Sequence, residues 1–270
     1  MDIPIHNLVR NWLVGIGLVL AACQPTATPF PVDIPTPATA TPTPGPPVPL
    51  RYGLSADAAG ALHDPALLAS GAQMIQLQET PLPSDLGARF DVIAAYGLYP
   101  DFTPSPVQAH LALVINTELP PLDNPALADV LLRSLDPAAL ASAMTIPGIQ
   151  PEPRESLPLS TLRAELANAG WPDGFDLWLA HQEIVGVVEL QAQLRQLNIH
   201  INPVPLQDRE INAHLTLVIW TTPQQRDELV LRVGDSGHIV DLLTLPISYL
   251  AAPGLDITFS PQGWPIATRP

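Results

Sequence analysis

Short apolar runs alternate with polar segments over residues 50–116 of the chain. A helical stretch at Asp64–Leu68, the turn-rich Glu79–Arg89 and the proline-broken Tyr99–Pro106 separate these runs. Alternation of this kind predicts strands linked by helices or loops, as in a parallel α/β sheet. The predicted strands are Leu50–Gly53, Met74–Leu77, Phe90–Tyr96 and His110–Asn116.

Three helices are expected next. Asn124–Pro125 and Asp136–Pro137 each combine a capping side chain with a proline in the first helical turn, which is a helix start signal. After a loop with four prolines, Thr145–Pro158, Ser160 caps the third helix and Gly170 supplies its left-handed stop. The predicted helices are Ala126–Leu135, Ala138–Met144 and Ser160–Asn168.

Residues Phe175–Leu206 form the clearest unit of the pattern. A strand at Phe175–Ala180 precedes a helix and a return strand at His200–Leu206, which predicts a right-handed parallel crossover. The apolar face of the helix is formed by Val187, Leu190, Leu194 and Leu197. Further strands are expected at Leu215–Trp220 and Leu229–Val233, and within the tail Ile239–Ile257, which ends in a turn at Pro261–Trp264.

The amino-terminal residues 1–22 have the pattern of a signal peptide. An apolar run, Trp12–Ala22, is too short to span a bilayer and ends in Leu20-Ala21-Ala22-Cys23, which resembles the bacterial lipobox. The resemblance implies that Cys23 is lipidated and becomes the first residue of the mature chain. The alternative is a short membrane helix with a chance cysteine, but Cys23 stands where the apolar run ends and a Pro/Thr tract begins.

The tract that follows Cys23 is expected to be a tether. Gln24–Pro49 contains ten prolines and six threonines, a composition that favours polyproline II over helix or sheet. Residues 23–49 would therefore separate a lipid anchor from the folded part, residues 50–270. A proline-rich ligand of SH3 type is the other interpretation of such a tract.

Charge and composition exclude several functions. Apolar residues make up 47% of the chain, which indicates a folded core, and its net charge of −15 offers no basic track for nucleic acid. The chain has no lysine, so lysine Schiff-base and P-loop chemistry are excluded. One cysteine and seven scattered histidines provide neither a disulfide nor a local zinc motif. No catalytic motif is found, so we expect a protein that is not an enzyme and has no cofactor or metal.

Three ordered segments resemble the extracellular solute-binding protein family 5, the peptide and nickel binders of ABC importers. They are Asn116–Asp123, Leu166–Phe175 and Leu190–Ile199, within a resemblance that covers about residues 111–220. The resemblance implies a shortened α/β fold like that of type II periplasmic binding proteins, with two small lobes or one and a half. Lobe I would comprise residues 50–108 and 239–270, and lobe II residues 109–238.

The resemblance also implies a function and a ligand site. The protein would be a membrane-anchored lipoprotein of the cell envelope that delivers a small solute or short peptide to an ABC permease. Trp220 ends an apolar strand, where ligands sit in open α/β sheets, and we expect Trp220, Thr221, Asn116 and Tyr96 to contact the solute.

Two departures from the family favour a different function. Members are usually more than twice as long, and peptide binders carry an aspartate soon after the strand-ending tryptophan. Here Thr221-Thr222-Pro223 follows Trp220, and the next acid is Asp227. The alternative is a degenerate surface lipoprotein with a structural or regulatory role and no transported ligand.

Lipidation of Cys23 is directly testable. Metabolic labelling with an alkyne fatty acid is expected to mark the wild type, and Cys23→Ser is expected to lose the label because the acyl groups attach through the cysteine. Label that persists in the Cys23→Ser protein would contradict a lipid anchor at this position.

Overall fold

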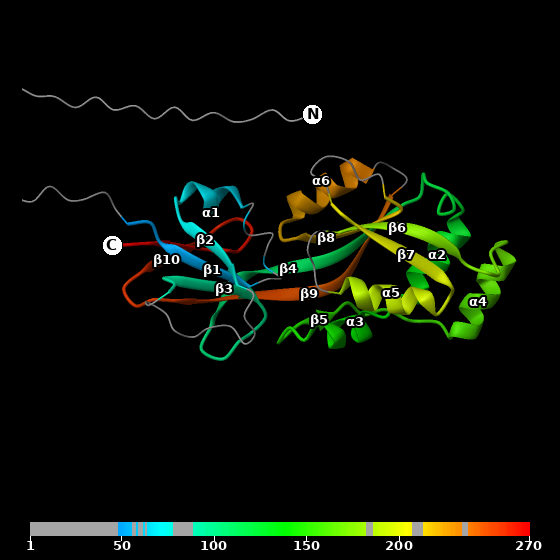
Figure 1. Cartoon of the computed structure of the whole chain (residues 1–270), viewed down its shortest axis with the longest axis horizontal. Coiled ribbons are helices and arrows are strands. Elements are labelled where there is room, and N and C mark those ends of the chain that lie inside the picture. The colour runs from blue at the N-terminus through cyan, green and yellow to red at the C-terminus, as the bar shows by residue number, and fades with distance from the viewer. Residues whose placement is uncertain are drawn as a thin grey trace, which may run out of the picture. The chain divides into compact units, whose positions relative to one another are not determined.

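The computed structural model describes residues 48–55, 58, 62, 64–77, 89–181, 186–206, 213–233 and 237–270 (Figure 1). The predicted signal peptide, Cys23 and residues 24–47 of the tether lie outside the described residues. None of the described helices is long and apolar enough to cross a membrane. The fold is mixed α/β, which confirms the predicted fold class.

A nine-stranded sheet organises the described chain, in the order β2-β1-β3-β9-β4-β8-β6-β7, with the short β5 also paired to β9. A separate hairpin joins β10 and β11. The strands are β1 Arg51–Ser55, β2 Gln73–Leu77, β3 Val92–Tyr96, β4 Thr103–Asn116, β5 Gln150–Pro151, β6 Phe175–His181, β7 Ile199–Pro205, β8 Leu215–Trp220, β9 Gly237–Ala251, β10 Asp256–Phe259 and β11 Pro265–Thr268. The helices are α1 Pro65–Ala69, α2 Pro125–Ser134, α3 Pro137–Met144, α4 Leu159–Asn168, α5 Val187–Arg195 and α6 Pro223–Val233.

Two groups of parallel strands lie at opposite ends of the long pair β4–β9 (Figure 1). The first half-sheet, β1–β3, is parallel, with β1 between β2 and β3. The second half-sheet, β6–β8, is also parallel, with β6 between β7 and β8. The parallel pairing of β6 and β7 around α5 confirms the crossover unit predicted from the sequence.

The centre of the sheet is antiparallel, so the parallel sheet predicted from the alternation is found only in the two half-sheets. Strand β9 pairs antiparallel with both β3 and β4, and β4 pairs antiparallel with β8. The apolar pattern marks strands but carries no direction, and the tail strand β9 inserts between two strands that are close in sequence. The result is a mixed sheet.

Both halves repeat one strand order, although no repeat is visible in the sequence. The orders are β2-β1-β3-β9-β4 and β7-β6-β8-β4-β9, so the two long strands exchange places. The carboxyl end of β3, Tyr96, pairs with Ile247, and the carboxyl end of β8, Trp220, pairs with His110. Both sets of carboxyl ends therefore point toward the middle of the β4–β9 pair. The sheet is continuous through both halves, and the division into two lobes stays a prediction.

The helix starts follow the predicted capping chemistry, with one exception. Asn124 Oδ1 accepts a hydrogen bond from the Ala126 N–H, and Asp136 Oδ1 accepts from the N–H groups of α3. The exception is α4, which begins at Leu159 after Pro158, so Ser160 is inside the first turn and does not cap it. Proline can hold this position because its fixed φ suits the approach to a helix.

Helix α6 corrects a second prediction, because Leu229–Val233 is helical and not a strand. Thr222 and Pro223 start this helix, and Gln225 completes a capping box, with the Gln225 N–H donating to Thr222 Oγ1 at 3.2 Å. Leu231 is 81% exposed, so the apolar run is not buried as a strand in the sheet would be. The helix start at Thr222 therefore determines the structure of this segment more strongly than the apolar run Leu229–Val233 does.

The two faces of the sheet have separate apolar clusters. The main core lies between one face and helices α2–α5, and it includes Leu113, Leu131 and Leu194. On the opposite face Ala112, Val114 and Val218 form a smaller cluster against Leu229 of α6. The tail is tied to β1 by the Ala267 N–H, which donates to the buried Tyr52 hydroxyl at 2.6 Å. Burial raises the pKa of Tyr52.

A close backbone contact at Gly174 gives a stability prediction. A Cβ on Gly174 would lie 2.1 Å from the Asn198 carbonyl oxygen, at a φ of +79°, whereas Gly170 has a φ of +92° and nothing within 4 Å. Gly170→Ala is therefore expected to lower the free energy of unfolding by about 1 kcal/mol through backbone strain alone. Gly174→Ala is expected to lower the free energy of unfolding by at least about 2 kcal/mol more than Gly170→Ala does, because its methyl group also clashes with the Asn198 carbonyl. Urea denaturation of both variants measures this, and equal losses would contradict the close contact.

Candidate functional site

A polar group lies where the second half-sheet meets the long strands. His110 of β4 pairs with Trp220 of β8 on one side and with Thr244 of β9 on the other. Residues directly opposite each other on neighbouring strands project from the same face of a sheet. His110, Trp220 and Thr244 therefore share a face, and it is the face covered by α6.

Trp220 is held by three contacts within the chain. Its ring stacks on His110 with centroids 4.1 Å apart and planes 13° apart. Its Nε1–H donates to Asp241 Oδ1 at 2.8 Å. The guanidinium carbon of Arg226, from α6, lies 5.9 Å from the ring centroid. The half-buried indole thus has a fixed orientation at the end of β8.

Charged groups flank this aromatic pair on both sides. Arg226 Nε lies 3.6 Å from Asp241 Oδ2, with side chains 38% and 26% exposed. The Thr244 hydroxyl donates to Glu152 Oε1 at 2.9 Å and lies 3.3 Å from His110 Nδ1. We call His110, Glu152, Trp220, Arg226, Asp241 and Thr244 the junction cluster. Its one arginine and two carboxylates give it a formal net charge of −1.

A β-bulge places both acidic residues in the junction cluster. Leu111 pairs with Leu243 but Ala112 pairs with Asp241, so Leu242 is an extra residue in β9. The bulge places Asp241 on the face of Thr244, although the two are three positions apart. The Leu242 carbonyl also accepts the Glu152 N–H at 2.9 Å, which holds Glu152 beside Thr244.

The predicted site residues are only partly brought together. Thr221 adjoins Trp220, but its hydroxyl donates to Gln225 Oε1 at 2.8 Å within the α6 cap. Asn116 lies at the far end of β4, six residues beyond His110, a distance of about 20 Å at strand spacing. Its Oδ1 accepts the Glu118 N–H at 3.0 Å.

Tyr96 is also separate from the junction cluster. It is 3% exposed, with its ring 5.2 Å from that of Trp264 in the main core. Alternation along β9 from Thr244 to Ile247 puts Tyr96 on the opposite face from Trp220. Ligand contact by Trp220, Thr221, Asn116 and Tyr96 stays a prediction.

Sequence reasoning missed most of the junction cluster. Glu152 follows β5, Arg226 lies on α6, and Asp241 and Thr244 lie on β9, so no local spacing links these three segments. His110 was one of several scattered histidines. The only sequence signal was that His110 and Trp220 each stood at one end of a predicted strand, and only the pairing of β4 with β8 joins them. Among the described residues, no group of three or more His, Cys, Asp or Glu side chains could hold a metal ion.

Comparison with protein-family models and with curated proteins finds no match. Among solved structures, 83 chains match. They include a dipeptide-binding protein from Pseudoalteromonas sp. SM9913 in complex with Met-Leu, at 14% identity and a TM-score of 0.47, over 69% of this chain and 51% of that one. A periplasmic oligopeptide-binding protein of an ABC transporter from Borrelia burgdorferi matches at 14% identity and a TM-score of 0.45, over 66% and 54%.

A third match is a substrate-binding protein from Microbacterium hydrocarbonoxydans complexed with 4-hydroxybenzoate hydrazide, at 14% identity and a TM-score of 0.46, over 64% of this chain and 53% of that one. The chain thus spans about half the length of these proteins. All three are described as binding proteins. Their low identities and TM-scores below 0.5 assign no ligand to this chain, and membership of family 5 stays a prediction.

The contact between Trp220 and Asp241 can be measured by a double-mutant cycle. Trp220→Phe keeps a ring on His110 but removes the N–H donor, and Asp241→Ala removes the acceptor. The two changes are expected to be non-additive, with a coupling free energy of about 0.5–1.5 kcal/mol in urea denaturation. Trp178→Phe on the exposed face of β6 is the matched control, expected to be additive with Asp241→Ala within about 0.5 kcal/mol. Additive behaviour of the Trp220 pair would contradict the hydrogen bond.

Proposed function

We propose that the protein is the extracytoplasmic solute-binding component of an ABC importer, anchored by a lipid on Cys23. The observation that carries the proposal is that the carboxyl ends of both parallel half-sheets point toward the middle of the β4–β9 pair, where the junction cluster lies. Ligands of open α/β sheets sit beyond the carboxyl ends of parallel strands, where the strand order reverses. The junction cluster lies at the carboxyl end of β8 and combines an aromatic pair with charged groups, which is the composition of many small-molecule sites.

The resemblance in the sequence supports a solute of the peptide or nickel-complex class. It spans residues 111–220, which include β6, β8 and Trp220. A stacked indole and imidazole with carboxylates on both sides suits an organic solute that has a planar or charged group. A short peptide meets that description, and an ABC permease would be the partner that receives it.

The alternative function, a surface lipoprotein that binds no transported solute, is favoured by a different observation. Trp220 is already engaged by its own chain, through His110, Asp241 and Arg226. The Thr221 hydroxyl is likewise engaged by Gln225. A site whose groups bind one another can be purely structural, and the two functions differ in whether any solute displaces these contacts.

Ligand binding is tested by thermal stability of the full chain. Short peptides, nickel complexes, sugars and amino acids are screened after native mass spectrometry for a retained solute. A solute at 100 times its Kd is expected to stabilise the fold by about 2.7 kcal/mol, which raises Tm by roughly 5–10 °C. Trp220→Ala is expected to abolish the shift and leave a folded protein.

Trp178→Ala is the matched control for the thermal-shift experiment. Trp178 is 53% exposed on β6, and its removal should leave the ligand-induced shift unchanged. If no solute class shifts Tm and Trp220→Ala unfolds the protein, Trp220 is a packing residue and the surface lipoprotein becomes the better account. A solute that raises the Tm of Trp178→Ala and Trp220→Ala equally would show that its binding site lies away from the junction cluster.

A further inference from the structure

The guanidinium of Arg226 lies where a bound cation would lie. Its central carbon is 5.9 Å from the Trp220 ring centroid, within the range of a cation–π contact, and its Nε faces Asp241 Oδ2. An aromatic face with a carboxylate beside it is a general way to bind a guanidinium or ammonium group. Arg226 thus acts as a cation supplied by the chain itself.

The contacts that hold Arg226 are loose. The 3.6 Å between Arg226 Nε and Asp241 Oδ2 exceeds hydrogen-bond distance, and the Arg226 side chain is 38% exposed. An ion pair that exposed contributes little because water screens it. Helix α6 has its own supports, the cap at Thr222 and the packing of Leu229 against the sheet. The Arg226 side chain can therefore leave Trp220 without unfolding the helix.

The electrostatics of the site favour a cation over an anion. Without Arg226 the junction cluster would keep the carboxylates of Asp241 and Glu152 and no compensating arginine. The net charge of −15 adds a long-range attraction for cations. The stack on His110 and the bond to Asp241 fix the indole in place, so its outer face is preorganised for a planar cation.

We propose that Trp220 and Asp241 form a binding site for the guanidinium group of a solute, and that Arg226 occupies this site until such a solute displaces it. This inference rests on the proposed function and names its solute class. Arg226 is an internal competitor that lowers the apparent affinity by keeping the site filled. Removing the competitor therefore strengthens binding of a guanidinium compound, whereas removing Asp241 weakens it.

The test uses arginine amide as the probe, because it carries the guanidinium but no carboxylate. Calorimetry is done on the full chain as wild type and as Arg226→Gln. Arg226→Gln is expected to bind the probe at least tenfold more tightly than the wild type, and Arg226→Gln with Asp241→Asn is expected to lose that gain. Citrulline amide, in which the guanidinium is replaced by a neutral urea group, is expected not to bind.

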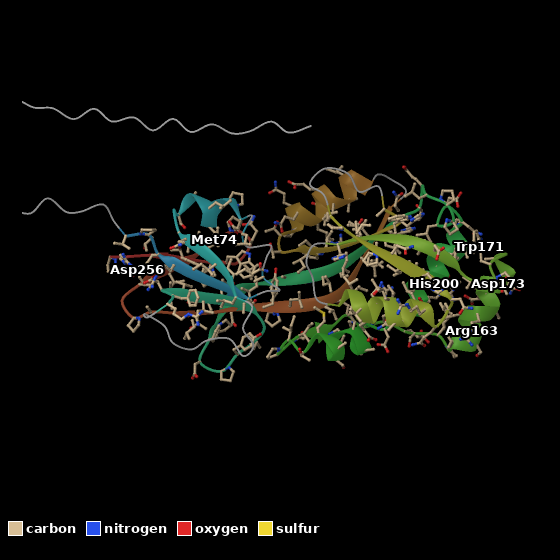
Figure 2. All side chains as sticks on the ribbon, viewed as in Figure 1. Met74, Arg163, Trp171, Asp173, His200 and Asp256 are labelled. Atoms are coloured by element: carbon tan, nitrogen blue, oxygen red, sulfur yellow. The ribbon has the colours of Figure 1, made fainter. Side chains whose placement is uncertain are left out.

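Arg163→Gln is the matched control variant. Arg163 projects from α4 and donates to the Gln196 carbonyl, and Figure 2 shows it at the α4 end of the molecule with Trp171 and Asp173. Its removal lowers the positive charge by the same amount, so its affinity for the probe should equal that of the wild type. A gain as large as that of Arg226→Gln would overturn the proposal in favour of a general charge effect.

Other outcomes separate this inference from the proposed function. Unchanged affinity in Arg226→Gln, with its Tm near that of the wild type, overturns the inference, and solute binding by the wild type would still support an importer component. Arg226→Met, which keeps much of the aliphatic stem, replaces Arg226→Gln if the latter does not fold. A wild type that binds no solute of any class, together with tight probe binding by Arg226→Gln, would show that no solute displaces Arg226, and it overturns both this inference and the transport function.

Discussion

The antiparallel pairing of β4 with β9 holds the rest of the structure together. These two strands are 14 and 15 residues long and pair over most of their length. Each also borders a parallel half-sheet, β3 beside β9 and β8 beside β4. Among the described strands, the two half-sheets are joined only through β9 and β4. Their carboxyl ends face the same central stretch of the long pair, so the pairing that joins the halves also positions the junction cluster.

The chemistry of the cluster depends on several elements at once. Trp220 is oriented from β8, His110 from β4, Asp241 from β9 and Arg226 from α6. No single one of these strands or helices supplies all the side chains of the cluster, and each contact between them contributes little free energy by itself. Their sum fixes one aromatic face beside the carboxylate of Asp241 in a region that is only half-buried. Such a site has a defined geometry, and it is exposed enough for a solute to replace one of its side chains.

The sequence predicted those elements well whose start or buried face is set by neighbouring residues. Asn124 and Asp136 cap the helices expected of them, and the apolar face of α5 packs on the sheet as its spacing indicated. Strand direction and the position of β9 are set by pairing between distant residues, which periodicity does not contain. The same limit applied to the site: Trp220 was found because it ends a strand, whereas Asp241 and Glu152 reach it only through the bulge at Leu242.

The bulge also has a consequence for how the strand finds its register. If β9 paired with β4 without the extra residue, Asp241 would face Leu113 and its carboxylate would enter the main core among leucines. Burying an unpaired charge there is strongly unfavourable, so the regular alignment is disfavoured. The carboxylate that makes the junction cluster acidic therefore also keeps β9 from sliding along β4 as the chain folds.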